Sequence, residues 1–391
     1  MTVPGPLGEQ SRDSRAEELK RRHVDARRRR IRRRRTWIVI AAVAAVVLAV
    51  VLAVVTVNAL EPKRPVRESG AIATSASPKP VSSTVAENPD TAPPTPVATP
   101  TATAGSETTT TPTPAPAPKP KFVAGRALRD VRALEAFGVR SGGSGAEQRG
   151  AEDIAARLQE AGVADVKTRP FPLPPIAKTS RNVIAVLPGE STKTIVLGAH
   201  MDSKYPSPGA NDNGSGCGAL LEIARCLAKQ PAYPTVKLVF FGTEEMIDAD
   251  PDHHHYGSRA FVAEMSKAAR DNVAGMISID MIGYGPDFVV RSMGRGPQTM
   301  VRLLQQQARK CDIRLSYLID PGLSGYSDHE AFELAGIPAA WIEWRDDPVY
   351  HTAADTSGHL VAAKVRQTGQ FLLDVLYGMD ERQLRELKPA M

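Results

Sequence analysis

Five side chains able to bind metal ions follow apolar segments in the second half of this sequence. Each is a carboxylate or an imidazole at or just beyond the end of a probable strand: His200, Asp212, Glu245, Asp280 and His351. Imidazoles and carboxylates without a thiolate suit zinc or a similar divalent ion in a catalytic role. Because one catalytic zinc takes three protein ligands, the set predicts two metals that share a bridging carboxylate, with a water between them.

Two further acids lie next to these candidate ligands. Glu244 directly precedes Glu245 and is free to act as a general base, since it need not bind the metal. Asp202 follows His200 by two residues and could accept the other ring N–H of that histidine, which would fix its tautomer.

The segments that must position these residues indicate strands alternating with helices. Apolar runs rich in Val, Ile and Leu favour a sheet covered on both faces, with its chemistry at the carboxyl ends of the strands. We expect residues 122–391 to form one α/β domain with a central mostly parallel (mixed) sheet flanked by helices on both faces. The expected strands are 182–187, 194–199, 236–241, 273–279, 288–292 and 338–344, and the expected helices are 146–161, 216–229, 258–269, 298–310 and 359–377.

The N-terminal region differs in composition from the rest of the chain. Residues 1–35 hold 13 Lys and Arg against five Asp and Glu. The formal charge of this segment, 13 minus 5 or +8, exceeds the formal net charge of the whole chain, which is +6. Residues 37–57 are 21 residues without a charge, about the length that a helix needs to cross a bilayer. The pattern predicts a basic cytoplasmic tail (1–35) and a transmembrane anchor (36–60), with the C-terminal side translocated. A cleaved signal peptide is the alternative, although its apolar region would be shorter.

Residues 61–121 are rich in Pro, Thr and Ala, with fourteen prolines between residues 61 and 120. Such a composition cannot bury a core and predicts a disordered stalk with polyproline II stretches. The folded domain would stand on this stalk outside the cell membrane. Because the basic charge is confined to the tail, where it sets orientation and attracts anionic lipid, we expect no nucleic-acid partner.

Other chemically suggestive residues favour structural roles. The three cysteines do not make a disulfide framework, and we expect buried thiols at Cys217, Cys226 and Cys311. The histidine run at residues 253–255 lies in a polar insert and favours a surface or rim loop over a third metal site. Asp328 is expected to cap a helix.

Seven short segments together resemble the co-catalytic dizinc aminopeptidase family, which includes secreted bacterial leucine aminopeptidases. They are GAHMDS, GANDNGSG, FFGTEEM, YGSRAFV, ISIDMIG, YSDHEAF and YHTAAD, and the similarity covers roughly residues 125–380. The family pattern implies that Asp212 bridges two Zn²⁺ ions. It assigns His200 and Asp280 to one ion, and Glu245 and His351 to the other.

The same resemblance implies an activity and roles for two more residues. Glu244 would take the proton of the water and deliver it to the leaving amine. Tyr350, adjacent to a ligand, resembles a tyrosine that stabilises the oxyanion in some members. The implied reaction is hydrolysis of the N-terminal residue of a peptide, outside the membrane.

Alternative functions remain open. Glutaminyl cyclases share this fold and resemble GAHMDSKY and HTAAD, but they use one zinc and release ammonia, so zinc stoichiometry and the product discriminate between the two readings. Carboxypeptidase-type members are a smaller alternative. A membrane-tethered binding protein without activity is the third, and it predicts that Glu244→Gln changes nothing measurable.

Overall fold

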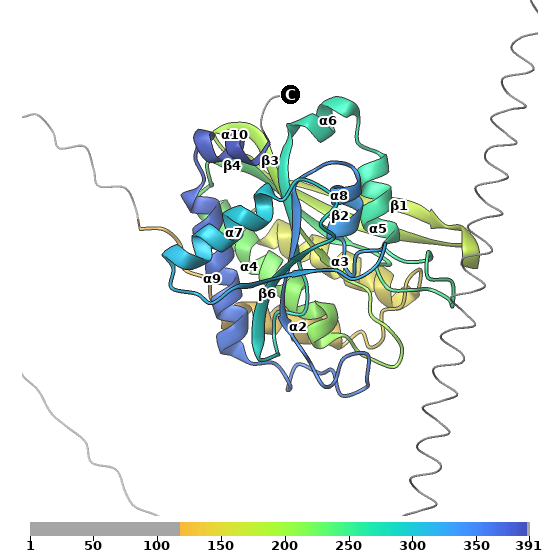
Figure 1. Cartoon of the computed structure of the whole chain (residues 1–391). Helices are drawn as coiled ribbons and strands as arrows, with labels where there is room; N and C mark the ends of the chain where they lie inside the picture. The colour runs from red at the N-terminus through yellow and green to blue at the C-terminus, as the bar shows by residue number, and fades with distance from the viewer. Residues whose placement is uncertain (1–117, 389–391) are drawn as a thin grey trace, which may run out of the picture. The chain divides into compact units, whose positions relative to one another are not determined.

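Residues 118–388 form an eight-stranded mixed sheet with helices on both faces in the computed structural model, which describes these residues (Figure 1). The strands lie in the order β1-β2-β4-β3-β5-β8-β6-β7. Their bounds are β1 Asp165–Leu173, β2 Lys178–Leu187, β3 Ser191–His200, β4 Pro234–Phe241, β5 Val273–Ile279, β6 Asp287–Ser292, β7 Ser316–Ile319 and β8 Ala339–Arg345. The helices are α2 Ala124–Glu135, α3 Gly145–Glu160, α4 Ser215–Lys229, α5 Tyr256–Ala263, α6 Lys267–Asn272, α7 Thr299–Lys310, α8 His329–Leu334, α9 Ala362–Gly378 and α10 Glu381–Leu387.

The central strands β4, β3, β5 and β8 run parallel to one another. Antiparallel pairs flank them, with β1 on β2 and β2 on β4 at one side and β6 on β8 at the other. The predicted mixed sheet is therefore confirmed, as are the helices on both of its faces. The carboxyl ends of the parallel strands meet at one edge of the sheet, where ligand sites collect in such folds.

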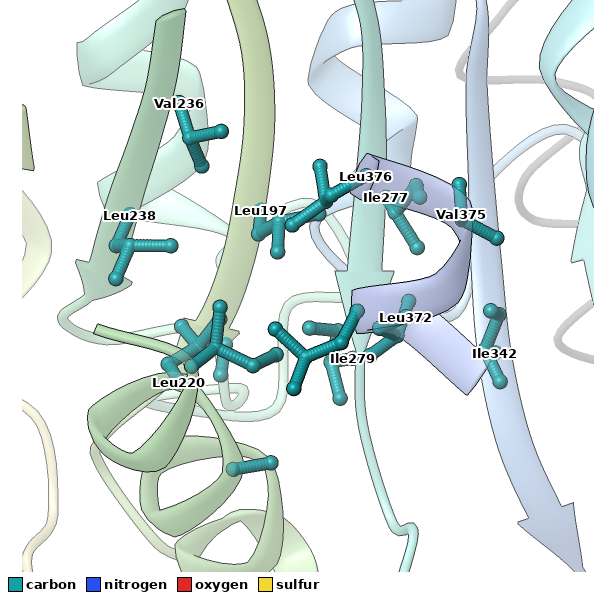
Figure 2. Packing of buried hydrophobic residues seen from close by; sticks show 14 of the residues in the cluster. Leu197, Leu220, Val236, Leu238, Ile277, Ile279, Ile342, Leu372, Val375 and Leu376 are labelled. Atoms are coloured by element: carbon teal, nitrogen blue, oxygen red, sulfur yellow. The ribbon is translucent and has the colours of Figure 1, made fainter. Parts of the chain in front are cut away.

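The central strands are buried on both faces, which explains their nearly continuous apolar sequence. In β3, Ile195 and Leu197 belong to the larger core cluster, whereas Val196 belongs to a smaller one on the opposite face. Figure 2 shows the larger cluster, in which Leu220 of α4 and Leu372 of α9 point toward the strands. Each fully buried side chain of this kind contributes roughly 1.5–3 kcal/mol relative to exposure. Packing from both sides thus fixes the strand ends.

Two sequence-based expectations about helices are corrected. Residues 258–269 are not one helix, because α5 ends at Ala263 and Ser266 starts α6 by accepting a hydrogen bond from the Ala269 N–H. A serine favours such a cap over a continued helix. Asp328 does precede α8, but its side chain makes no cap hydrogen bond.

Several elements gave too weak a sequence signal to be predicted. Strand β1 is exposed along most of its length and contains two prolines, so it lacks the apolar run of a buried strand. Among the cysteines, Cys217 and Cys226 are buried as expected and Cys311 is half-buried, and all three are free.

The N-terminal predictions fall outside the described residues. The tail (1–35), the anchor (36–60) and nearly all of the stalk (61–121) therefore stay predictions. Within residues 118–388, no helix has the length and apolar character needed to cross a membrane.

Candidate metal centre

The carboxyl ends of neighbouring strands bring the five predicted ligands together. His200 is the last residue of β3, and Asp280 directly follows β5. Glu245 lies shortly beyond the end of β4. Asp212 lies in the turn that leads into α4, and His351 lies in the loop after β8.

Asp212 lies between two groups of ligands. Its Oδ1 is 3.1 Å from Nε2 of His200, and that nitrogen is 3.5 Å from Oδ1 of Asp280. Its Oδ2 is 3.1 Å from Nε2 of His351, which is 2.8 Å from Oε1 of Glu245. The ligand atoms of each group of three lie within 4.8 Å of one another. One carboxylate therefore faces both groups, as a bridging ligand would.

This donor set requires cations that the chain itself does not provide. His200, Asp212 and Asp280 are at most 4% exposed, and Oδ1 of Asp280 has no hydrogen-bond partner among residues 118–388. A buried carboxylate oxygen without a partner is costly. Within the same residues, Asp212, Glu245 and Asp280 form ion pairs with histidines. Divalent metal ions fit these nitrogen and oxygen donors and would supply the missing charge.

Crowding of buried acids shifts the pKa values of several groups at this centre. Burial, together with the charge on Asp212, raises the pKa of Glu245 to about 8. Burial also raises the pKa of Asp280, against the opposing effect of His200. For His351, burial favours the neutral ring, but the neighbouring acids outweigh it and raise the pKa to about 10. The pKa of all three groups is thus shifted upward at this centre.

Glu244 lies beside both groups of ligands without joining either. Its Oε1 is 2.8 Å from Nε2 of His255, and its Oε2 is 4.0 Å from Nε2 of His200. Burial alone would raise the pKa of Glu244, but the two histidines outweigh it and hold the pKa below its usual range. An ionised carboxylate next to the ligands is what a general base requires.

Asp202 holds the Glu244–Glu245 backbone as well as facing His200. Its two carboxylate oxygens accept hydrogen bonds from the N–H of Glu244 at 3.0 Å and of Glu245 at 3.1 Å. Its Oδ1 is 3.3 Å from Nδ1 of His200, yet that nitrogen makes no hydrogen bond within residues 118–388. Asp202 therefore lies next to the His200 ring as expected, but the two do not form the hydrogen bond that would fix the tautomer of His200.

Two buried residues that the sequence did not reveal hold the loop of Asp212. Asp355 accepts hydrogen bonds from the N–H of Asp212 at 3.2 Å and of the preceding residue at 2.6 Å. Arg140, fully buried, donates to the carbonyl oxygens of Met201 at 2.8 Å and Gly209 at 3.0 Å. The YHTAAD segment could have pointed to Asp355, whereas nothing in the local sequence marks Arg140.

Two glycines let the ligand-bearing turns approach the sheet closely. A Cβ at Gly216 would lie 2.2 Å from the carbonyl oxygen of Ile279, directly before Asp280. A Cβ at Gly242 would lie 2.3 Å from Oγ of Ser180. Any larger residue would push α4 or the Glu244 turn away from the strand ends.

A cleft of about 900 Å³ opens over the centre. The candidate ligands lie among its lining residues, together with Met281, Trp341 and Tyr350. Tyr350 is 50% exposed, and its ring stacks on that of His351 with centroids 3.7 Å apart. The cleft is large enough for a small molecule or the end of a peptide.

The insert lies at the cleft, as the expectation of a surface or rim loop allowed, but two of its three adjacent histidines are buried rather than exposed. His254 and His255 are 8% and 2% exposed, and both line the cleft. His253 alone of the three stays partly exposed, with Nδ1 2.7 Å from Oδ2 of Asp248. The polar composition of the insert did not reveal that Nε2 of His255 meets Glu244 and Nε2 of His254 meets Arg259 inside the fold.

The sheet and this centre together define an α/β protein with a candidate two-metal site of hydrolase type. The sequence model of peptidase family M28 matches residues 182–376. This part of the folded domain is therefore similar to that family, in agreement with the resemblance seen in the sequence. Aminopeptidase YwaD of Bacillus subtilis is 28% identical over 222 residues, which cover 54% of this chain and 47% of that protein. The chain thus spans about half the length of this curated relative.

Solved structures agree with this fold. A zinc aminopeptidase from Bacillus subtilis matches with a TM-score of 0.59 at 19% identity, covering 66% of this chain and 95% of that one. A glutaminyl cyclase from Bacteroides thetaiotaomicron matches with a TM-score of 0.59 at 24% identity, covering 67% and 100%. Both likenesses concern the fold, which peptidases and cyclases share.

Proposed function

We propose that this chain is a zinc-dependent aminopeptidase that removes N-terminal residues from peptides. One observation carries the proposal: the two oxygens of Asp212 face separate groups of ligands, and an ionised Glu244 lies beside them. The match to peptidase family M28 and the similarity to an aminopeptidase support the reaction. The fold shared with a zinc aminopeptidase supports the metal, and the two ligand groups support two ions per chain.

Each site residue then has a defined task. Zinc ions held by the two groups would act as Lewis acids that polarise the scissile carbonyl and lower the pKa of a water. Oε2 of Glu244 would accept the proton of that water and deliver it to the leaving amine as the C–N bond breaks. The hydroxyl of Tyr350 would donate a hydrogen bond to the oxyanion. The acids of the cleft would bind the free α-amine, which confines cleavage to the first residue.

Replacing the base tests this proposal. The full chain and its Glu244→Gln variant are compared for release of arylamine from amino-acid arylamides, with zinc counted in both. We expect kcat to fall about 10²- to 10⁴-fold because proton transfer is lost. Both zinc ions should be retained, since Glu244 belongs to neither ligand group. Equal rates would contradict the proposal and favour the tethered binding protein.

The product and the zinc count test the cyclase alternative. The wild-type chain is given a peptide with N-terminal glutamine and, separately, an arylamide. An aminopeptidase releases arylamine and needs both ions. Ammonia release without arylamine, at full activity with one zinc, would overturn the peptidase function.

We further infer that residues 36–60 anchor the chain in the cell membrane with the catalytic domain outside. The uncharged run 37–57, the basic tail before it and the Pro-rich stalk after it support this arrangement. Membranes from cells that express the full chain provide the test. We expect the chain to resist extraction by alkaline carbonate and its domain to be cleaved by externally added protease. Release by carbonate would contradict the anchor.

A further inference from the structure

His255 contacts the candidate base through both its backbone and its ring. It precedes α5 in the left-handed conformation, with φ 54° and ψ 31°, and its N–H donates to the carbonyl oxygen of Glu244 at 2.7 Å. Its ring Nε2 lies 2.8 Å from Oε1 of Glu244. Since His255 is 2% exposed, water does not compete for this contact.

The other side of the His255 ring faces an acid that is itself held in place. Nδ1 lies 3.6 Å from Oε1 of Glu330, within ion-pair distance but beyond a hydrogen bond. Oε1 of Glu330 accepts from Arg259 at 2.6 Å, and Oε2 accepts from the N–H of Gly325 at 2.7 Å. The ring thus lies between two carboxylates, and two separate parts of the fold hold that of Glu330 in place.

A third metal ion does not explain this cluster. Ligand atoms of His254, His255 and Glu330 lie within 4.8 Å of one another, as metal ligands would. Nη2 of Arg259, however, lies 3.0 Å from Nε2 of His254 and 2.6 Å from Oε1 of Glu330. A guanidinium stays charged in proteins and would repel a cation there. Nε2 of His255 is directed at Glu244, and its Nδ1 has no hydrogen-bond partner within residues 118–388, so the charge of Arg259 is what argues against an ion.

We propose that His255 is a positioning residue that holds Glu244 in place as a base. The contact occupies Oε1 and leaves Oε2 on the side of His200, 4.0 Å from its Nε2. Without it the Glu244 carboxylate can turn toward the candidate ligands and bind an ion as an extra ligand. His255 therefore determines how the Glu244 carboxylate is oriented, and it prevents that carboxylate from binding a metal ion. The inference rests on the proposed function of this site.

Three variants of the full chain test the role. His255→Ala should lower kcat about 10- to 100-fold, as loss of an outer partner does in metal sites, with little change in KM or zinc content. His255→Gln should recover much of the rate because its amide can donate to Oε1 of Glu244. His253→Gln is the matched control, since that ring is partly exposed and pairs with Asp248. The proposal would be overturned if His253→Gln lost as much kcat as His255→Ala, or if His255→Gln recovered none of the rate.

A double variant shows whether His255 acts through Glu244. If it does, adding His255→Ala to Glu244→Gln causes no further loss in kcat, because the group being positioned is already gone. Losses that multiply would assign His255 an independent role and refute positioning.

Crystal structures of the wild type and of His255→Ala decide the point without any assay. We expect the Glu244 carboxylate to leave its place in the Ala variant and to stay in the wild type. An unmoved Glu244 overturns the inference even if the enzyme is active. A moved Glu244 in a chain that cleaves no peptide would uphold the positioning and refute the proposed function alone.

Discussion

Two groups of buried acids in this domain are compensated by different kinds of side chain. Between α2 and α4, Asp130 and Glu222 are 2% and 0% exposed, and arginines pair with both. Nη1 of Arg225 lies 2.6 Å from Asp130, and Nε of Arg126 lies 2.8 Å from Glu222. At the carboxyl edge of the sheet, three buried acids of the cleft pair within residues 118–388 with histidines: Asp212, Glu245 and Asp280.

The choice of partner separates a structural cluster from a functional one. An arginine keeps its charge and offers donors alone, so it neutralises an acid permanently and leaves no room for an ion. A neutral histidine offers a lone pair and can bind the same metal as the acid beside it. In this domain, the arginine partners of Asp130 and Glu222 therefore indicate architecture, whereas the histidine partners shared by Asp212, Glu245 and Asp280 indicate a place for cations.

The largest difference between the clusters should appear in activity. Asp212→Asn removes the ligand that faces both groups, so kcat should fall by more than the 10²- to 10⁴-fold or so expected for Glu244→Gln, with loss of zinc. Asp130→Asn leaves the cleft intact and should keep both the zinc content and kcat. Arylamide hydrolysis with metal analysis checks the pair. Equal losses would show that the comparison does not separate function from architecture.

Metal removal should lower the thermal stability of the domain, and this change should depend on the histidine-paired acids and not on the arginine-paired ones. Zinc at about 100 times its Kd stabilises a folded site by about 2.7 kcal/mol, so chelation should lower Tm by roughly 5–10 °C. Thermal unfolding with chelator and with excess zinc measures this shift. Asp130→Asn should keep the shift although its absolute Tm is lower, and Asp212→Asn should lose it. A shift that persists in Asp212→Asn would place the stabilising zinc elsewhere.

The elements that could be predicted from the sequence are those with a regular pattern of apolar residues. The six expected strands, including 194–199 and 273–279, correspond to observed strands because buried parallel strands require continuous apolar runs. The position of the candidate ligands at one edge of the sheet was predictable for the same reason, since each follows such a run. Strands β1 and β7 were missed because one is largely exposed and the other has four residues.

Contacts between distant segments could not be predicted from local pattern. Arg140 binds carbonyl oxygens more than sixty positions away, and His255 meets Glu244 only because its turn folds back over the end of β4. A polar insert with three histidines has the composition of a surface loop whether or not its rings are buried. Such partners are set by tertiary structure, which composition does not encode.

The smallest expected effect is the loss of folding stability when an acid of the arginine-paired cluster is replaced. Glu222 accepts hydrogen bonds from the Val123 N–H and from Arg126, so it ties the start of α2 to α4. Its arginine partners are 33% and 21% exposed, and they can regain water when Glu222 is replaced. Glu222→Ala should therefore cost less than the 3–5 kcal/mol or so of a fully buried pair, about 1–2 kcal/mol. Denaturant unfolding measures the change.

Asp271→Ala is the reference for this last prediction. Asp271 pairs with Lys267 on the surface, where the two side chains are 48% and 83% exposed. An exposed pair contributes about 0–1 kcal/mol, so its loss should be close to undetectable. Zinc content and kcat should stay unchanged in both variants, because neither residue lines the cleft. A Glu222→Ala chain that unfolds like Asp271→Ala would mean that burial adds nothing to the arginine pairs, and a change in its zinc content would mean that the two clusters are coupled through α4.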